Sequence, residues 1–239
     1  MPAPQVEALL PVYNEAEIIE STIREWRDEL TPRVAAGFII CEDGSEDGTR
    51  GILERLGREL PVRLNLRGSR RGYSQAAVRD GMRMPQSDYL LCVDSDGQCD
   101  PKDFWRFREA RGTADLILGR RLERADPALR RAFRRVSYCI YQPVLRTPAH
   151  DPSCPYALMS KRTVARLVDE LSDVREGFWW EFVARAHRRG CSIREVPIHP
   201  RRRSHGETQV YRPGKTVEIF PKHVVAVLRI WSDTRKRDR

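Results

Sequence analysis

Short apolar runs alternate with longer amphipathic stretches through the first half of the chain. Five runs predict strands: Glu7–Val12, Phe38–Cys41, Val62–Leu66, Tyr89–Val93 and Asp115–Leu118. The first stretch between them, Glu15–Leu30, places Ile18, Ile19, Ile23 and Trp26 at helical spacing. Such alternation is typical of a parallel sheet covered by helices, so the sequence predicts an α/β fold built from five βα steps.

Local signals place the other helices of this half. Ser45 or Asp47 would cap the second helix, because their side-chain oxygens accept from the free N–H groups of its first turn. The third helix is expected over Gly72–Met84 and the fourth from Pro101, since proline suits the first helical position. Tyr89–Val93 is apolar throughout, which indicates a central strand.

From Arg120 onward the pattern changes. The expected elements are an arginine-rich helix over Leu129–Val144, a loop interrupted by prolines, helices over Lys161–Leu171 and Gly177–Arg189, and a strand over Ile193–Ile198. No repeat or low-complexity linker separates the two halves. We therefore expect one globule with a nucleotide-binding half at 1–120, an acceptor-side half at 121–210 and a basic C-terminal segment at 211–239.

The C-terminal segment Lys215–Ile230 carries apolar residues at helical spacing, flanked by basic ones. It is either a helix that packs on the core or an amphipathic helix that lies on a membrane surface. No apolar stretch approaches the roughly 18 to 20 residues that span a bilayer. Met1–Gln5 has neither a basic start nor a cleavage site, so no signal peptide is predicted and the chain is expected in the cytoplasm.

Composition and charge narrow the classes of function. The composition excludes a disordered chain, because 40% of the 239 residues are hydrophobic. The net charge is +9, and arginine carries nearly all of the positive charge. The guanidinium group of arginine binds phosphates and carboxylates through paired hydrogen bonds. The six cysteines show no metal-ligand spacing and are expected to be reduced, packed thiols. No recognition-helix motif accompanies the basic run at 199–205, so nucleic acid is not expected as a partner.

An acidic loop, Asp94-Ser95-Asp96-Gly97-Gln98, follows the strand predicted to be central. The carboxyl ends of strands in a parallel sheet open into the crevice that binds ligands. Two carboxylates and an amide at this edge offer the oxygen ligands that Mg²⁺ prefers, with substrate phosphates completing its shell. The simpler interpretation is an acidic turn that caps the next helix, for which Asp100 alone suffices.

Two more polar loops follow the second and the first predicted strands. Asp43, in the loop Glu42–Thr49, can accept hydrogen bonds from a base or a ribose, while the glycines beside it permit close backbone approach. Asn14 and Glu15 follow the first strand directly. Each loop can equally be a plain turn that caps the helix after it.

These loops occur together in the order and spacing of family 2 glycosyltransferases. The matching motifs are Pro11-Val12-Tyr13-Asn14-Glu15, Glu42-Asp43-Gly44-Ser45, Arg71-Gly72, Asp94-x-Asp96-x-Gln98, Gly119-Arg120-Arg121, Asp151-Pro152-Ser153, Glu181, and Glu195-Val196-Pro197-Ile198 followed by Arg203. Over about Ala8–Gln209 the chain resembles the polyprenol-phosphate (dolichol-phosphate) mannosyltransferase branch of that family. The resemblance implies the GT-A fold, a Rossmann-like, mostly parallel sheet flanked by helices.

The resemblance also implies roles for single residues. The nucleotide sugar is expected to contact Pro11, Tyr13, Asn14, Glu15, Glu42, Asp43, Ser45, Arg71, Gly72, Asp94 and Ser95, with Asp43 reaching the base or ribose. The metal, Mg²⁺ or Mn²⁺, is expected on Asp94, Asp96 and Gln98. Catalytic roles are implied for Asp96, Arg121, Asp151 and Glu181, and contacts to the acceptor phosphate for Arg121, Arg134, Ser137 and Arg203.

The implied activity is metal-dependent inverting transfer of one hexose from GDP-mannose or a UDP-hexose to a polyprenyl phosphate at the inner face of the membrane. A lipid phosphate is already an anion and needs no strong base, so arginines would suffice to bind it. A hydroxyl acceptor would instead need a carboxylate as its base, and Asp151 and Glu181 are the candidates. The Gln-x-x-Arg-Trp motif of processive synthases is absent, which predicts a single transfer.

Departures from the family pattern concentrate on the acceptor side. Arg120 stands in place of the serine of Gly-Ser-Arg, and Cys154-Pro155 in place of the residues that usually follow Asp-Pro-Thr. Thr208-Gln209 replaces Ser-Lys and removes one cation. These departures keep open a soluble relative that glycosylates a hydroxyl of a small molecule or saccharide.

Two alternatives come from other classes. A nucleotidyltransferase that makes nucleotide sugars also uses a Rossmann-like sheet and Mg²⁺, but it would need a glycine-rich, lysine-bearing loop after the first strand. A non-catalytic binding module would have no need of the full Asp94, Asp96 and Gln98 set. Both alternatives therefore fit these residues less well than sugar transfer does.

Overall fold

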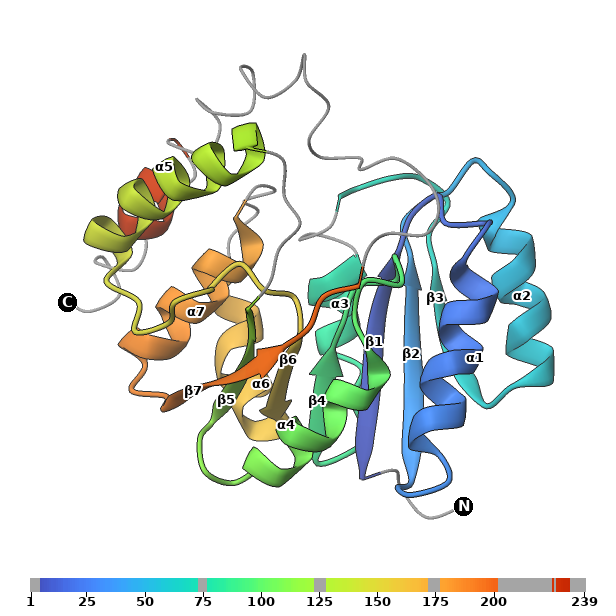
Figure 1. Ribbon diagram of the computed structural model, residues 1–239. Coiled ribbons are helices and arrows are strands. Elements are labelled where there is room, and N and C mark those ends of the chain that lie inside the picture. Colours follow the sequence, from blue (N-terminus) through green and yellow to red (C-terminus); the bar gives the residue numbers. More distant parts are fainter. Residues whose placement is uncertain are drawn as a thin grey trace.

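A sheet of seven strands forms the centre of the computed structural model, which describes residues 5–72, 77–122, 128–171, 177–201, 225 and 227–232. For residues 128–134, 137 and 140 the description is limited to the backbone. The strands are β1 (Val6–Val12), β2 (Ala36–Glu42), β3 (Val62–Leu66), β4 (Tyr89–Cys92), β5 (Leu116–Arg121), β6 (Ala157–Ser160) and β7 (Ile193–Ile198). They lie in the order β3-β2-β1-β4-β6-β5-β7 (Figure 1).

The sheet is mostly parallel, as the sequence pattern predicts. β6 is the exception, because it pairs antiparallel with both β4 and β5. All five strands predicted in the first half are present, and β4 lies at the middle of the order, as its apolar pattern indicates. The sequence does not predict β6, since its four residues closely follow Pro152 and Pro155, which are signals for a loop.

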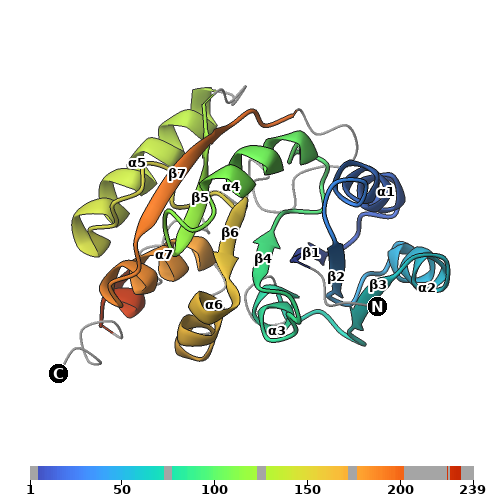
Figure 2. The ribbon, with the colours of Figure 1, turned by 90° about the horizontal axis from the view of Figure 1, so that it is seen from below.

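Helices cover both faces of the sheet (Figure 2). The helices are α1 (Ile19–Leu30), α2 (Thr49–Glu59), α3 (Arg79–Met82), α4 (Phe104–Ala110), α5 (Ala128–Leu145), α6 (Lys161–Leu167) and α7 (Phe178–Arg188). Apolar residues of α1, α2 and α4 share one buried cluster with the sheet, and those of α3, α6 and α7 share another. The parallel sheet is therefore buried on both sides, which explains the unbroken apolar runs of its central strands.

The starts of two helices differ from the predictions. α1 begins at Ile19 rather than Glu15, because the N–H groups of Glu15 and Ala16 donate to side chains of the loop after β2. The helix from Pro101 begins as a 3₁₀ turn, Pro101–Asp103, which Asp100 caps by accepting from the N–H of Lys102. The capping interpretation of Asp100 is thus confirmed.

The C-terminal helical segment, residues 225 and 227–232, packs against α5 and α7 (Figure 1). Val227 and Ile230 are buried in a cluster with Tyr141, Trp180 and Ala184. The core-packing interpretation therefore holds for these two residues. Of the rest of the predicted helix Lys215–Ile230, the structure describes residues 225, 228 and 229. In the described part of the chain, no helix combines the length and apolarity needed to cross a membrane.

The cysteines are free, and all but one are buried as expected. Cys139 on α5 is the exception, since it is exposed. Burial raises the pKa of Cys41 and of Cys154 to about 12, so these thiols stay neutral. The expectation of packed thiols is therefore correct except at Cys139.

Candidate active site

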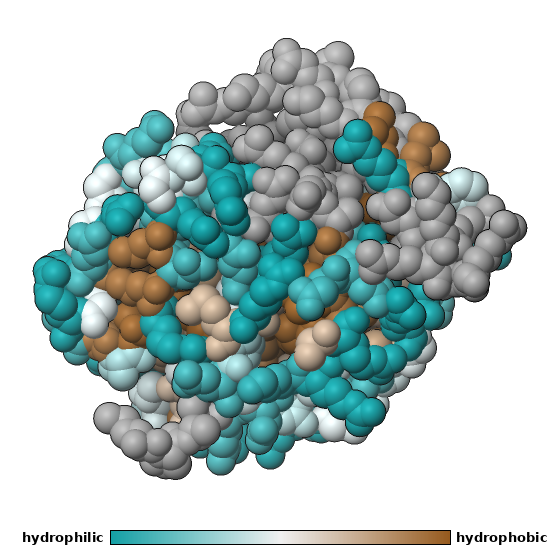
Figure 3. Space-filling view, turned by 180° about the vertical axis from the view of Figure 1, so that it is seen from behind, coloured by the Kyte–Doolittle hydropathy of each residue, from teal (hydrophilic) through white to brown (hydrophobic). Residues whose placement is uncertain are grey.

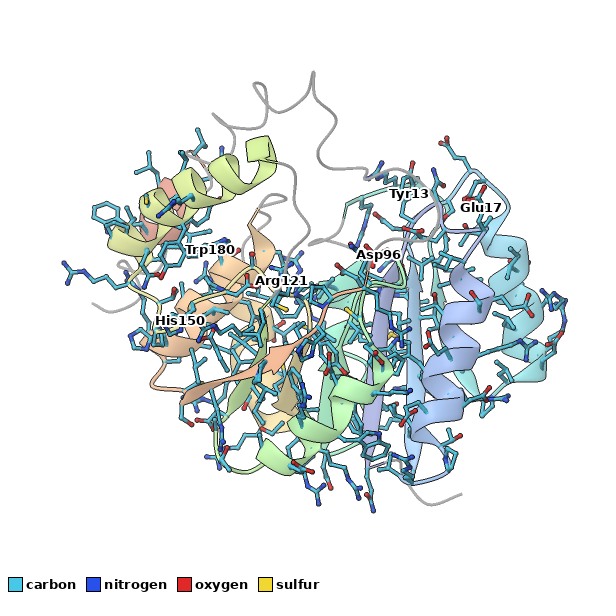
Figure 4. The ribbon with its side chains drawn as sticks, viewed as in Figure 1. Tyr13, Glu17, Asp96, Arg121, His150 and Trp180 are labelled. Atoms are coloured by element: carbon cyan, nitrogen blue, oxygen red, sulfur yellow. The ribbon has the colours of Figure 1, made fainter. Side chains whose placement is uncertain are left out.

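The loops that follow β1, β2 and β4 meet at the carboxyl edge of the sheet, where Figure 4 places Tyr13 and Asp96. The Ser95 hydroxyl donates to the carbonyl of Pro11 over 2.8 Å, and the N–H of Asp43 donates to the carbonyl of Val12 over 3.0 Å. The parallel pairing of β1 with β2 and β4 brings these three loops together. The structure thus confirms that the residues predicted for the donor side share one edge.

Asn14 ties the loop after β1 to the loop after β2. Its N–H donates to the Ser45 hydroxyl over 3.0 Å, and its side-chain oxygen accepts from the N–H of Glu46 over 2.9 Å. The N–H of Glu15 donates to the Thr49 hydroxyl over 2.9 Å. The backbone of Asn14 is left-handed, with a φ of 53°, a conformation that asparagine tolerates better than most residues. Asn14 is therefore suited to this position by its backbone as well as its side chain.

Asp47 connects the same two loops through its carboxylate. It accepts from the N–H groups of Ala16 and Thr49, each over 3.1 Å. Burial would raise the pKa of Asp47, but the hydrogen bonds from Thr49 and Ala16 outweigh it and hold the pKa below its ordinary value. Asp47 accepts from the N–H of Thr49, the first residue of α2, but the N-cap position itself is Gly48 and not the predicted Asp47 or Ser45.

Asp43 anchors the backbone that follows β3. Its carboxylate is 3% exposed and accepts from the N–H of Arg71 over 2.9 Å and from the N–H of Gly72 over 2.7 Å. A carboxylate oxygen accepts more than one hydrogen bond, so contact with a base or ribose stays a prediction. The neighbouring Glu42 is fully buried, and one of its oxygens accepts from the N–H of Ser45.

Tyr13 lies under an arginine that the sequence alone does not single out. The Arg70 guanidinium stacks over the Tyr13 ring, with 3.6 Å between its central carbon and the ring centroid. Gly44 makes this approach possible, because a Cβ there would lie 2.5 Å from the backbone nitrogen of Arg70, and its φ of +74° is left-handed. Arg70 therefore lies against Tyr13, one of the residues predicted to contact the nucleotide sugar.

The acidic loop after β4 is held to the chain that leaves β7. Asp96 accepts from the N–H of Gln98 over 3.1 Å. The Gln98 side-chain nitrogen donates to the carbonyl of Arg201 over 3.3 Å, and the N–H of Arg201 donates to the carbonyl of Gln98 over 2.9 Å. Arg201 also pairs with Asp100 over 2.8 Å. Gln98 thus joins two segments, a role that its spacing alone does not predict.

Asp94 and Asp96 are both half-buried at the end of β4. Their carboxylates fit a hard divalent cation that takes one or two protein ligands and completes its shell with substrate phosphates. The residues that the structure describes contain no group of three or more His, Cys, Asp or Glu that could hold a metal by themselves. The donor set therefore fits a metal that binds together with a diphosphate rather than an all-protein metal site. The side-chain nitrogen of Gln98 donates to Arg201, so the side-chain oxygen is the atom that would bind the predicted metal.

Arg121, the last residue of β5, forms a paired salt bridge with Asp151. Its Nε and one terminal nitrogen each lie 2.7 Å from an Asp151 oxygen, and the terminal nitrogen also donates to the Ser153 hydroxyl over 2.8 Å. The two side chains are only 19% and 15% exposed. Two predicted acceptor-side residues are thus brought together, and Ser153 joins them.

Glu195 on β7 accepts hydrogen bonds from the backbone next to this pair. One of its oxygens accepts from the N–H of His150 over 2.9 Å and from the N–H of Asp151 over 2.8 Å. The other oxygen lies 2.6 Å from the His150 ring nitrogen Nδ1. Glu195 belongs to a motif that matches the family but has no predicted role, and in the structure it positions the backbone of Asp151.

Electrostatics favour the charged forms of both partners. Burial would raise the pKa of Asp151, but the hydrogen bonds and charge of Arg121 outweigh it and hold the pKa below its ordinary value. Burial would lower the pKa of Arg121, but acidic groups that include Asp151 and Asp94 raise it. Both members of the pair therefore stay charged.

Glu181 occupies a different environment from Asp151. It is fully buried on α7 and pairs with Arg185 one helical turn later, over 2.7 Å. The adjacent Trp179 and Trp180 are 6% and 8% exposed, so both belong to the core. Glu181 contributes to the interior of α7, and a catalytic role for it stays a prediction.

Several predicted acceptor contacts lie outside the described residues. Arg203 is one, and the side chains of Arg134 and Ser137 on α5 are two more. Arg71, predicted for the donor side, is half-exposed and pairs with Asp80 over 3.0 Å. The acceptor side of the site is therefore represented by Arg121, Asp151 and Ser153.

Comparison with known proteins places the chain among glycosyltransferases. The family described as Glycosyl transferase family 2 matches residues 8–167. Glycosyltransferase AglD of Haloferax volcanii is 28% identical over 204 residues, which cover 81% of this chain and 32% of AglD. The chain thus spans about a third of the length of this relative. Undecaprenyl-phosphate mannosyltransferase of Micrococcus luteus is 26% identical over 216 residues, which cover 86% of this chain and 87% of that protein.

The fold is shared with solved structures of low sequence identity. Glucosyl-3-phosphoglycerate synthase of Mycobacterium tuberculosis, in complex with phosphoglyceric acid, gives a TM-score of 0.71 at 17% identity, covering 96% of this chain and 80% of that one. A complex of the same protein with Mn²⁺, UDP-glucose and phosphoglyceric acid gives a TM-score of 0.70 at 16% identity. These likenesses confirm the expected GT-A fold. The family match covers more than half of the chain, so the chain belongs to glycosyl transferase family 2.

Proposed function

We propose that the protein transfers one hexose from a nucleoside-diphosphate sugar, GDP-mannose or a UDP-hexose, to a polyprenyl phosphate. The proposal includes a divalent metal on Asp94 and Asp96 and inversion at the anomeric carbon. In that step a phosphate oxygen of the acceptor bonds to the anomeric carbon while the bond from that carbon to the diphosphate breaks. The undecaprenyl-phosphate mannosyltransferase relative, which the chain matches over 87% of its length, supports this class of acceptor.

The donor side supports binding of a nucleotide diphosphate. Asn14, Asp43 and Asp47 tie the strand-end loops to one another, so these loops are ordered before a ligand arrives. Loops that are already ordered lose less conformational entropy when a ligand binds, so binding costs less free energy. A metal held by Asp94 and Asp96 would stabilise the charge that develops on the leaving diphosphate. The Mn²⁺ and UDP-glucose bound by the Mycobacterium tuberculosis protein support that assignment.

The Arg121–Asp151 pair is the observation that carries the choice of acceptor. Both Asp151 oxygens accept from Arg121, and the pKa of Asp151 is lowered, so this carboxylate is a poor acceptor for the proton of a hydroxyl group. The guanidinium of Arg121 is at the same time held in one place by Asp151 and Ser153. A fixed cation and an occupied carboxylate suit an acceptor that arrives as an anion.

Glu181 is the other carboxylate considered as a base. It is fully buried and already pairs with Arg185. Deprotonating a hydroxyl acceptor would require hydrogen-bond reach from Glu181 to the acceptor. Burial and pairing of Glu181 therefore support an anionic acceptor as well.

The deciding experiment compares two acceptors that differ only in the phosphate. Purified protein is incubated with a radiolabelled nucleotide sugar, Mn²⁺ or Mg²⁺, and either a short-chain polyprenyl phosphate or the matching polyprenol. We expect labelled product with the phosphate and none with the alcohol. Transfer to the alcohol at a comparable rate would overturn the proposal.

A soluble phosphorylated hydroxy acid is the second acceptor to test. The shared fold with glucosyl-3-phosphoglycerate synthase, over 96% of this chain, favours including it. Transfer to phosphoglyceric acid but not to polyprenyl phosphate would establish the hydroxyl-acceptor alternative. The same assay with both acceptors present would show which one the protein prefers.

A further inference from the structure

Four of the five large hydrophobic residues exposed in the described part of the chain lie on two helical segments that pack side by side. The five are Leu122, Val136, Val225, Leu228 and Trp231. Three of them belong to the C-terminal helical segment and Val136 belongs to α5, which packs beside it. At the upper right of Figure 3, hydrophobic residues are exposed over this end of the molecule.

The C-terminal helical segment has two different apolar faces. Val227 and Ile230 point into the cluster shared with α5 and α7 and are 1% and 0% exposed. Val225, Leu228 and Trp231 recur every third residue along the opposite side and are 47%, 54% and 36% exposed. Because a helix turns once in 3.6 residues, this spacing makes one stripe. Core packing therefore explains only half of the apolar pattern.

Cations border this exposed apolar surface, which we define as Val136, Val225, Leu228 and Trp231. Arg229 is exposed between Leu228 and the end of the segment, and Arg135 is exposed beside Val136 on α5. The sequence that follows, 233–239, adds four basic residues and two acidic ones. Exposed apolar side chains flanked by arginines complement a surface that is apolar below and anionic above, as an acidic phospholipid layer is.

We propose that this apolar surface and its arginines dock the protein on an anionic phospholipid bilayer. The inference deepens the proposed function and rests on it, because a polyprenyl phosphate acceptor resides in a membrane. α5, which carries Val136, also carries the predicted acceptor-phosphate residues Arg134 and Ser137. Docking through this end would bring the bilayer to the acceptor half and leave the donor loops on the far half of the sheet open to the nucleotide sugar (Figure 4).

The first test is flotation of the full chain with lipid vesicles. We expect the protein to float with phosphatidylcholine vesicles that contain phosphatidylglycerol, and less with phosphatidylcholine alone or at high salt. A double variant, Leu228→Ser with Trp231→Ser, should lower the bound fraction about tenfold or more, because burial of each side chain contributes to membrane affinity. Leu122→Ser is the matched control, since Leu122 is 52% exposed and lies on neither helix.

The charged component has its own pair of variants. Arg229→Glu should weaken binding to the phosphatidylglycerol vesicles by about thirtyfold, because the reversal changes two unit charges at about 1 kcal/mol each near such a surface. Arg58→Glu, an exposed arginine on α2, should leave it unchanged. Thermal melting and circular dichroism of every variant should match the parent protein, so that lost binding is not lost folding.

Three outcomes would overturn the proposal. One is that the Leu228/Trp231 double variant binds vesicles as well as the parent does. Another is that the parent does not float with either kind of vesicle. The third is that sedimentation shows a dimer that the double variant dissociates, since the surface would then join two copies of the chain.

An activity measurement separates this proposal from the proposed function. The double variant should lose transfer to polyprenyl phosphate in vesicles and keep transfer to a short-chain phosphate in solution. Equal loss with both acceptors would overturn the docking role. A parent protein that binds vesicles but transfers sugar to neither phosphate would overturn the proposed function and leave the docking surface standing.

Discussion

The two halves of the site use their carboxylates in different ways. In the donor half, Asp43 and Asp47 accept from backbone N–H groups of neighbouring loops. In the acceptor half, Asp151 and Glu181 pair with the arginine side chains Arg121 and Arg185. Every residue except proline supplies an N–H group, whereas a salt bridge needs two particular residues. The donor loops are therefore held through backbone groups, and the acceptor half adds matched ion pairs to the backbone contacts that Glu195 makes.

Loss of Asp96 should have the largest effect and separate ligand binding from loop structure. Asp96→Ala is expected to abolish the metal-dependent rise in melting temperature with a nucleotide sugar and to lower transfer by about a thousandfold. Asp28→Ala, on an exposed part of α1, is the control. If Asp96→Ala retained the metal-dependent shift, the assignment of the metal to this loop would be wrong.

Disruption of the acceptor-side pair should come next. Asp151→Asn leaves Arg121 charged and poorly paired, which should lower the free energy of unfolding by about 3 kcal/mol and transfer by about a hundredfold. Urea unfolding and a transfer assay measure the two effects. Asp169→Asn, which alters an exposed pair with Arg83, should change stability by less than about 1 kcal/mol. Comparable losses in the two variants would show that the buried Arg121–Asp151 pair contributes no more than an exposed pair does.

The same pair predicts a pH dependence of stability. Because the pKa of Asp151 is lower in the folded state, its contribution is present above the unfolded pKa of about 4 and is lost as pH falls through the folded value. The stability difference between the parent protein and Asp151→Asn should therefore be largest at neutral pH and shrink in acid. A difference that stays constant down to about pH 2 would show that Asp151 does not contribute through its charge.

Glu195 should have a smaller effect that is specific to positioning. Glu195→Gln keeps the shape of the side chain but weakens acceptance from the N–H groups of His150 and Asp151. We expect kcat to fall about tenfold while the KM for the nucleotide sugar changes little, since the donor loops are untouched. A rise in that KM without a fall in kcat would place Glu195 on the donor side instead.

Arg70 should have the smallest effect of those considered. Arg70→Ala removes a stacking contact with Tyr13 that is worth about 0.5 to 1 kcal/mol at an exposed site. Donor affinity, measured by calorimetry, should therefore change by about fivefold or less. A change of about a hundredfold would mean that Arg70 binds the diphosphate directly.

The difference between the halves also explains what the sequence could predict. Strands β1 to β5 and the donor loops follow from local signals: apolar runs, capping residues and a closely spaced Asp94-x-Asp96. β6 could not be predicted, because its short run follows prolines and gains its partners from β4 and β5. Gln98 pairs with Arg201 across 103 positions, and no local pattern announces such a contact.

Ion pairs illustrate the same limit. Arg121 and Asp151 could each be named as candidates, but nothing in the sequence says that they neutralise one another. Glu181 and Arg185 are different, because a spacing of four residues on a predicted helix is itself a signal for an ion pair. That spacing weakens Glu181 as a candidate base, since its carboxylate already accepts a hydrogen bond from Arg185.

The antiparallel strand β6 has a consequence for the size of the ligand. It lies between β4, which ends beside Asp94, and β5, which ends at Arg121. Two strand spacings of about 4.8 Å separate those neighbours, so β6 acts as a spacer of about 10 Å between donor and acceptor charges. Backbone hydrogen bonds fix this width, so the separation of the two charged groups does not depend on the side chains of the loops at either end.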